Sequence, residues 1–135
     1  MAGRFRRVGR LKAEGKSLPR YALLRHTGAP DDPSGCHIDL LLEDVESCRT
    51  WRIPQLPLAD GTTQDAVPLP PHRLIWLDPR SAAVSGNRGW AERIRSGHYS
   101  GDLPDDATAA VNVMLSGDLQ GRLQINKGRC CLSNP

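Results

Sequence analysis

The segment Cys36-His-Ile-Asp-Leu-Leu-Leu-Glu43 predicts a β-strand, and it also sets where chemistry is expected. Side chains of a strand alternate between two faces with a period of two residues. One face would be purely apolar, made of Cys36, Ile38, Leu40 and Leu42. The other face would carry His37, Asp39, Leu41 and Glu43. An apolar face is typical of a strand that packs on a core, and Ser47–Ile53 is the expected hairpin partner.

Most of the remaining pattern is also strand-like. Short apolar runs alternate with turns rich in Gly and Pro, which number 13 and 11 in the chain. Further strands are expected at Tyr21–Arg25, Thr108–Leu115 and Leu119–Ile125, the last two as a hairpin. A proline-rich irregular connection is expected over 54–71, and for 90–95 both helix and strand remain open. The sequence therefore predicts a mostly β fold, a compact β-barrel-like single domain with few short helices.

The 135 residues make one domain of ordinary size, and their formal charge of +3 is unevenly distributed. Residues 1–20 hold seven Lys or Arg side chains and one Glu, which gives this segment +6. Residues 21–135 hold eleven basic and fourteen acidic side chains, which gives −3. We therefore expect residues 1–19 to be a basic flexible arm and residues 20–135 to form the β domain.

Several classes of protein are excluded by the sequence pattern. No apolar run approaches the roughly 18 residues that a membrane-spanning helix needs, and no heptad repeat persists. The charged N-terminal segment has no apolar stretch of the kind found in secretion signals. Without such a signal, the four cysteines favour reduced thiols over a disulfide framework, so a cytoplasmic location without membrane partners is expected.

His37 and Asp39 form an H-x-D pair on one strand face. A rise of about 3.3 Å per residue puts them about 6.6 Å apart along the strand, so an imidazole and a carboxylate can reach one cation. This ligand pair suits Mn²⁺, Zn²⁺ or Fe²⁺. The same pattern also fits a solvated polar face on an amphipathic strand. His26 and His72 lie at the edges of expected elements, and each is either a loop histidine or a partner of this pair. Glu43 either orients a metal-bound histidine or is a solvated side chain.

The order of these residues resembles the 3′-phosphoesterase domain of bacterial DNA ligase D and its small stand-alone relatives. The resemblance rests on His26, His37-Ile-Asp-Leu-Leu-Leu-Glu43, Trp51-Arg-Ile-Pro54, His72 ahead of Trp76, and Leu115-Ser-Gly-Asp-Leu-Gln-Gly-Arg122. It covers roughly residues 20–127, which is most of the chain.

The resemblance implies a compact β-barrel-like domain that binds a divalent metal, usually Mn²⁺, with Zn²⁺ as the second possibility. Carried over by position, the metal ligands are His26, His37 and Asp39, and His72 is the catalytic histidine near the scissile phosphate. Family members remove a 3′-terminal ribonucleoside or a 3′-phosphate in DNA repair. The implied partners are therefore nucleic-acid 3′ ends, of DNA or RNA–DNA, and a separate ligase or polymerase.

Three positions depart from the family pattern. Leu41 stands where the family has an arginine, Trp76 where it has a tyrosine, and Pro70 where it has an acidic residue. A leucine cannot bind phosphate, whereas a guanidinium grips it with two hydrogen bonds. Candidates to replace the lost charge are Arg25, Arg73, Arg88 and Arg93, and we assign substrate binding to Arg25 and Arg73.

Three hypotheses for the function remain open. The first is a metal-dependent 3′-phosphoesterase of the 3′-ribonuclease or 3′-phosphatase type. The second is a catalytically weakened relative that binds metal or nucleic acid as a non-enzymatic repair accessory, which the three departures favour. The third is a β domain without metal that serves as an interaction module.

Overall fold

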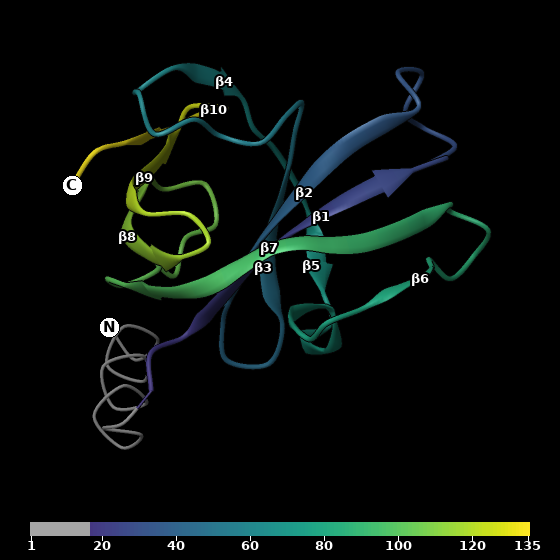
Figure 1. Cartoon of the computed structure of the whole chain (residues 1–135), viewed down its shortest axis with the longest axis horizontal. Coiled ribbons are helices and arrows are strands. Elements are labelled where there is room, and N and C mark those ends of the chain that lie inside the picture. Colours follow the sequence, from purple (N-terminus) through teal and green to yellow (C-terminus); the bar gives the residue numbers. More distant parts are fainter. Residues whose placement is uncertain (1–16) are drawn as a thin grey trace.

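The computed structural model describes residues 17–135, and within them the fold is almost entirely β (Figure 1). The strands are β1 (Arg20–Thr27), β2 (Cys36–Glu43), β3 (Cys48–Ile53), β4 (Thr63–Asp65), β5 (Val67–His72), β6 (Ser81–Ala83), β7 (Trp90–Ser100), β8 (Val111–Gly117), β9 (Gly121–Asn126) and β10 (Arg129–Ser133). A short 3₁₀ helix, η1 (Leu74–Leu77), lies between β5 and β6. The predicted mostly β class is confirmed. The expected basic arm lies outside the described residues, except for residues 17–19.

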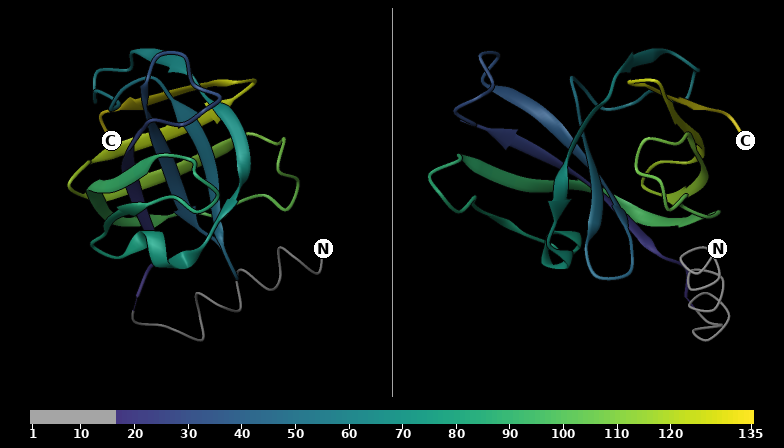
Figure 2. Two further views of the ribbon diagram at one scale, coloured as in Figure 1. Left: turned by 90° about the vertical axis from the view of Figure 1, so that its right-hand side faces the viewer. Right: turned by 180° about the vertical axis from the view of Figure 1, so that it is seen from behind.

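The strands of the described region form one antiparallel sheet in the order β4-β10-β9-β8-β7-β1-β2-β3-β5, with β6 added beside β7. The sheet curls around a central core, as the left view of Figure 2 shows. It is not closed, because β4 and β5 remain its two edges. The barrel-like single domain expected from the sequence is therefore an open, curled sheet.

Two apolar clusters occupy opposite faces of β1 and β2. The larger cluster fills the inside of the curled sheet and includes Leu23 and Leu40. The smaller cluster lies on the other face, where Leu24 and Leu41 join Trp76 of η1. The predicted alternation of faces along residues 36–43 is thus confirmed. Because both faces are covered, six consecutive residues of β2 are buried.

The proline-rich region 54–71 is more regular than expected. It contains β4 and most of β5, so the expectation of an irregular connection is wrong there. β5 is an edge strand beside β3, and at an edge a proline costs no ladder hydrogen bond on the open side. In residues 90–95 the strand alternative is correct, since β7 runs unbroken from Trp90 to Ser100.

The expected C-terminal hairpin is confirmed as β8 and β9, which pair from Val111–Ile125 to Leu115–Gly121. β10 then pairs with β9 and was not anticipated. Within residues 17–135, a helix with the length and hydropathy required for crossing a bilayer is absent.

Replacing Leu41 with Ala should destabilise the protein by about 2–5 kcal/mol, because this fully buried side chain would leave a cavity in the smaller cluster. Chemical denaturation followed by tryptophan fluorescence measures the change. Leu58→Ala is the matched control: that side chain is 60% exposed, and its loss should change the free energy of unfolding by less than about 0.5 kcal/mol. Equal effects of the two substitutions would contradict a core position for Leu41.

Candidate metal centre

The pairing of β1 with β2 brings two histidines together. His26 lies directly opposite His37 in the antiparallel register, and their ring centroids are 4.7 Å apart. Asp39 is two residues further along β2 and projects from the same face as His37. Its Oδ1 lies 3.0 Å from His37 Nε2, and its Oδ2 lies 3.0 Å from His26 Nδ1. The H-x-D spacing thus places both side chains in one cluster.

The three side chains are buried and their ligand atoms converge. His26, His37 and Asp39 are 8%, 3% and 1% exposed, and one ligand atom of each lies within 4.8 Å of the other two. A buried carboxylate is costly unless positive charge or hydrogen-bond donors compensate it. The surroundings of each ring nitrogen therefore decide what this cluster can hold.

His26 is fixed by the backbone of a distant loop. Its Nε2 atom lies 2.7 Å from the carbonyl oxygen of Arg88. A carbonyl oxygen only accepts, so Nε2 carries the proton that is donated. In a neutral imidazole the other nitrogen, Nδ1, then presents a lone pair, and this nitrogen faces Asp39 Oδ2.

His37 is fixed through its opposite nitrogen. Its Nδ1 lies 2.7 Å from Asp32 Oδ2. Hydrogen bonds from Ser34, and next from His37, lower the pKa of the Asp32 carboxyl to about 2, so this acceptor is an anion at neutral pH. The proton therefore stays on Nδ1, and Nε2 presents its lone pair to Asp39 Oδ1. Neither of these two facing atoms has a hydrogen-bond partner among the described residues.

Lone pairs of two imidazoles and one carboxylate therefore face one another across distances of 3.0 Å. With neutral rings this arrangement is repulsive, and it is relieved either by protonation of the rings or by a cation shared among them. The unpartnered atoms His37 Nε2 and Asp39 Oδ1 fit a bound cation. Two imidazoles and one carboxylate suit Mn²⁺, Zn²⁺ or Fe²⁺. The residues present thus fit the divalent metal expected from the sequence.

Asp39 is the electrostatic centre of the cluster. Burial raises the pKa of its carboxyl. The nearby His72 ring, together with the positive charge that His37, His72 and His26 carry when protonated, outweighs burial and leaves the pKa of Asp39 below its usual value. The cluster is therefore built around an anion and favours positive charge beside it.

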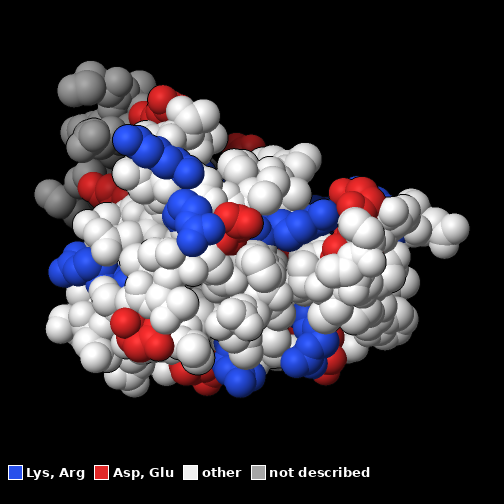
Figure 3. Space-filling model, turned by 90° about the horizontal axis from the view of Figure 1, so that it is seen from above, with Lys and Arg blue, Asp and Glu red and all other residues white. Residues whose placement is uncertain are grey.

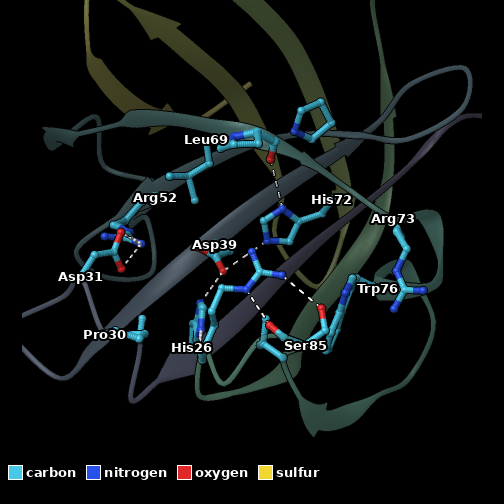
Figure 4. A pocket seen from close by; sticks show the side chains of 15 residues that line it. His26, Pro30, Asp31, Asp39, Arg52, Leu69, His72, Arg73, Trp76 and Ser85 are labelled. Carbon is cyan, nitrogen blue, oxygen red and sulfur yellow. Dashed lines mark hydrogen bonds and ion pairs between the residues drawn. The ribbon is translucent and has the colours of Figure 1, made fainter.

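His72, the last residue of β5, lies beside this cluster. Its Nε2 is 3.6 Å from Asp39 Oδ2, and its Nδ1 donates to the Pro70 carbonyl at 3.3 Å. Figure 4 shows His26 and His72 both pointing toward Asp39. The His72 side chain is 25% exposed and lines an adjacent pocket. Its Nε2 is therefore the nitrogen that can exchange a proton with a bound molecule.

The adjacent pocket has a volume of about 540 Å³. Its apolar walls are made of Ala29, Pro30, Leu69, Pro70, Pro71, Trp76 and Val84. Three arginines also line it, Arg52, Arg73 and Arg88. Asp31 holds the Arg52 guanidinium at 3.2 Å, and the Ser85 carbonyl and hydroxyl hold that of Arg88. The pocket thus combines apolar walls with positive charge beside the candidate ligands.

The structure brings together most of the predicted site residues. His26, Asp39, His72 and Arg73 line the pocket, and His37 completes the cluster of ligand atoms. Arg25 is exposed and projects from the opposite face of β1 to His26, because adjacent residues of a strand point opposite ways. Its assignment to substrate binding is therefore not supported by its position.

Of the other positions considered in the sequence, some line the pocket and others lie away from it. Arg88 lines the pocket, whereas Arg93 donates to the Leu77 carbonyl. Leu41 and Trp76, which both depart from the family pattern, belong to the same apolar cluster. Glu43 orients no histidine: its carboxylate accepts from the Arg20 backbone N–H and its carbonyl accepts from the Tyr99 hydroxyl.

Two residues of the site were not anticipated from the sequence. Arg52 pairs with Asp39 in the hairpin of β2 and β3, a register that the predicted hairpin could have supplied. Asp32 belongs to the turn-rich loop between β1 and β2. No pattern in that loop indicates that it folds back onto His37.

No protein-family model matches this chain, and the curated proteins include none with significant similarity to it. The likeness to the ligase-linked 3′-phosphoesterases therefore rests on the quoted residues and stays a prediction. The cluster and the pocket stand on geometry alone.

Acidification should destabilise the fold between about pH 4 and pH 2 through Asp32. Its pKa is about 2 in the folded protein against an ordinary 3.8, so in this range the folded state binds fewer protons than the unfolded chain. The contribution is complete well above the ordinary pKa of 3.8 and is lost as the pH falls through about 2. Unfolding at a series of pH values should show a steeper loss in wild type than in Asp32→Asn. Parallel curves would speak against an ionised Asp32 beside His37.

Proposed function

We propose that this protein is a metal-dependent phosphoesterase that acts on 3′ ends of nucleic acid. The observation that carries the proposal is the buried cluster of His26, His37 and Asp39, in which His37 Nε2 and Asp39 Oδ1 lack hydrogen-bond partners, beside a pocket lined by arginines and by His72. Imidazole and carboxylate ligands next to guanidinium groups are a combination suited to hydrolysis of a phosphate ester. The resemblance to the 3′-phosphoesterases supports a 3′ end as the substrate.

His26 Nδ1, His37 Nε2 and the Asp39 carboxylate are the proposed ligands, with Mn²⁺ as the metal and Zn²⁺ as the alternative. When bound, such an ion polarises a phosphoryl oxygen and lowers the pKa of a coordinated water. The Arg88 carbonyl and the Asp32 carboxylate already hold both rings in the tautomer that presents a lone pair. Binding therefore needs no reorientation of either ring.

The arginines of the pocket are the proposed phosphate-binding groups. A guanidinium can bind two oxygens of one phosphate in parallel. Arg52 and Arg88 are each held in place by a neighbour, which fixes the direction of their free N–H groups. Arg73 adds a third positive charge at the pocket. Together they would balance the negative charge of a bound phosphate.

His72 is the proposed proton-transfer residue. The Pro70 carbonyl holds the proton on Nδ1, so Nε2 is available on the side of the pocket. The neutral ring would accept a proton at Nε2, and the charged ring would donate it to the leaving oxygen. The nearby Asp39 carboxylate, 3.6 Å from Nε2, stabilises the charged ring.

Attraction for nucleic acid is focused at the pocket. The face shown in Figure 3 carries Lys and Arg interspersed with Asp and Glu, without a uniformly basic area. A pocket of about 540 Å³ has the size of a site for one small ligand, which suits a single terminal nucleotide. The seven basic side chains of residues 1–20 would add salt-dependent attraction to the backbone phosphates. A separate ligase or polymerase would use the cleared end.

A second candidate function is that of a catalytically weakened relative that binds metal or nucleic acid as an accessory in DNA repair. The observation that favours it is Leu41, which is fully buried in the smaller cluster where the family has an arginine. Loss of one charged donor from such a site lowers the rate by about 10²–10³. This candidate predicts stoichiometric metal without turnover.

The test is incubation of the purified full chain with Mn²⁺ and a primer–template that ends in a 3′-ribonucleotide or a 3′-phosphate. Wild type should remove the terminal group. His37→Ala removes a proposed ligand and His72→Ala removes the proton-transfer group, so each should lower the rate at least about 100-fold. His98→Ala is the matched control, because this histidine lies on β7 away from the pocket, and it should leave the rate unchanged.

Equal trimming by wild type and His37→Ala would show that the activity does not come from this site and would overturn the proposal. Stoichiometric Mn²⁺ without any trimming would replace the first candidate function with the second. A protein that takes up neither Mn²⁺ nor Zn²⁺ would overturn the first candidate function and the metal-binding form of the second.

A further inference from the structure

We propose that Asp32 is a positioning residue of the metal centre, whose carboxylate acts through His37 to orient and strengthen the Nε2 ligand. This inference rests on the proposed metal site and deepens it. Asp32 lies in the loop between β1 and β2, and its side chain turns toward the sheet and contacts His37. The Asp32 carboxylate contacts His37 Nδ1, and the Nε2 atom of the same ring faces Asp39.

The contact between Asp32 and His37 is short and shielded. Asp32 Oδ2 lies 2.7 Å from His37 Nδ1, and the two side chains are only 9% and 4% exposed. A hydrogen bond from an imidazole to a carboxylate at this distance is charge-assisted and stronger than one between neutral groups. Partial negative charge is thereby passed to the ring, which makes Nε2 a better electron donor.

The Asp32 carboxylate is itself held rigidly. Its other oxygen, Oδ1, accepts from the Ser34 backbone N–H at 3.0 Å and from the Ser34 hydroxyl at 2.6 Å. The loop is closed by a hydrogen bond from the Gly28 backbone N–H to the Gly35 carbonyl, and the Asp32 backbone N–H donates to the Ala29 carbonyl. The two carboxylate oxygens thus act separately, because Oδ1 closes the turn and Oδ2 orients the histidine.

The second histidine of the cluster lacks such an anion. His26 donates its remote proton to the neutral carbonyl of Arg88 at 2.7 Å. A carboxylate increases the basicity of a ring more than a carbonyl does. His37 is therefore the stronger imidazole ligand of the pair, and the metal affinity should depend on Asp32.

A purely structural role for Asp32 would be closure of its turn, and the chain contains a matched control for that role. Asp106, between β7 and β8, accepts from the Thr108 backbone N–H at 2.9 Å and from its hydroxyl at 2.7 Å. This repeats the contacts that Asp32 makes with Ser34. Asp106 does not line the pocket. Asp106→Ala therefore removes equivalent turn-closing hydrogen bonds at a position outside the candidate metal site.

The experiment is titration of the metal-free full chain with Mn²⁺ by calorimetry. Asp32→Ala should weaken Mn²⁺ binding about 10–100-fold, the usual effect of losing an outer hydrogen-bond partner of a metal ligand. Asp32→Asn keeps an oxygen that can close the turn but loses the negative charge, so it should weaken binding by a smaller factor. Asp106→Ala should leave the affinity within about twofold of wild type.

Cobalt(II) provides a readout that closure of a turn would not affect. The visible ligand-field bands of bound Co²⁺ should shift in Asp32→Asn, because the donor strength of His37 changes, and should not shift in Asp106→Ala. Wild-type affinity and unshifted bands in both Asp32 variants would overturn this inference while leaving the metal site intact. Failure of the wild-type protein to bind Mn²⁺ or Co²⁺ would overturn the metal site and this inference with it.

Discussion

The antiparallel register of β1 and β2 is the constraint on which the candidate site depends. It places His26 opposite His37, and a slip of one residue would turn one ring to the other face of the sheet. Further along the same strands, Leu23 pairs with Leu40 inside the curled sheet and Ala22 pairs with Leu41 on the outside. Packing on both faces of the pair therefore fixes the positions of the chemical groups near its end.

The second constraint is electrostatic. Asp39 is almost fully buried, and every imidazole near it has its remote nitrogen tied to an oxygen that only accepts: the Arg88 carbonyl, the Asp32 carboxylate or the Pro70 carbonyl. Those contacts direct lone pairs of neutral rings toward the carboxylate. Buried polar groups that repel one another lower the stability of a fold, and they are expected where function requires them. A shared cation turns the same arrangement from repulsive to favourable, which is the physical reason for interpreting it as a metal centre.

The sequence predicted the parts of the site that depend on local periodicity. Alternation along residues 36–43 gave the common face of His37 and Asp39, and it also accounts for the two apolar faces of β2. The same rule places Arg25 away from His26, and applying it to β1 would have excluded Arg25 from the pocket. The contribution of Asp32 depends on the conformation of the loop between β1 and β2. The periodicity of side chains along a strand carries no information about that conformation. β5 was missed because proline opposes a strand everywhere except at an edge, and edge position is a property of the whole sheet.

Leu41 and Trp76 connect the fold to the choice between the two candidate functions. Both belong to the apolar cluster that η1 covers, so these two departures from the phosphoesterase pattern pack together in one apolar unit. In the proposed phosphoesterase, phosphate would instead be bound by Arg52, Arg73 and Arg88, which line the pocket. The central claim, a divalent metal held by two imidazoles and one carboxylate, is tested most directly by anomalous diffraction from a crystal of the protein soaked in Mn²⁺. We predict one anomalous peak within bonding distance of His26 Nδ1, His37 Nε2 and the Asp39 carboxylate, and a map with no peak among these three groups would contradict the claim.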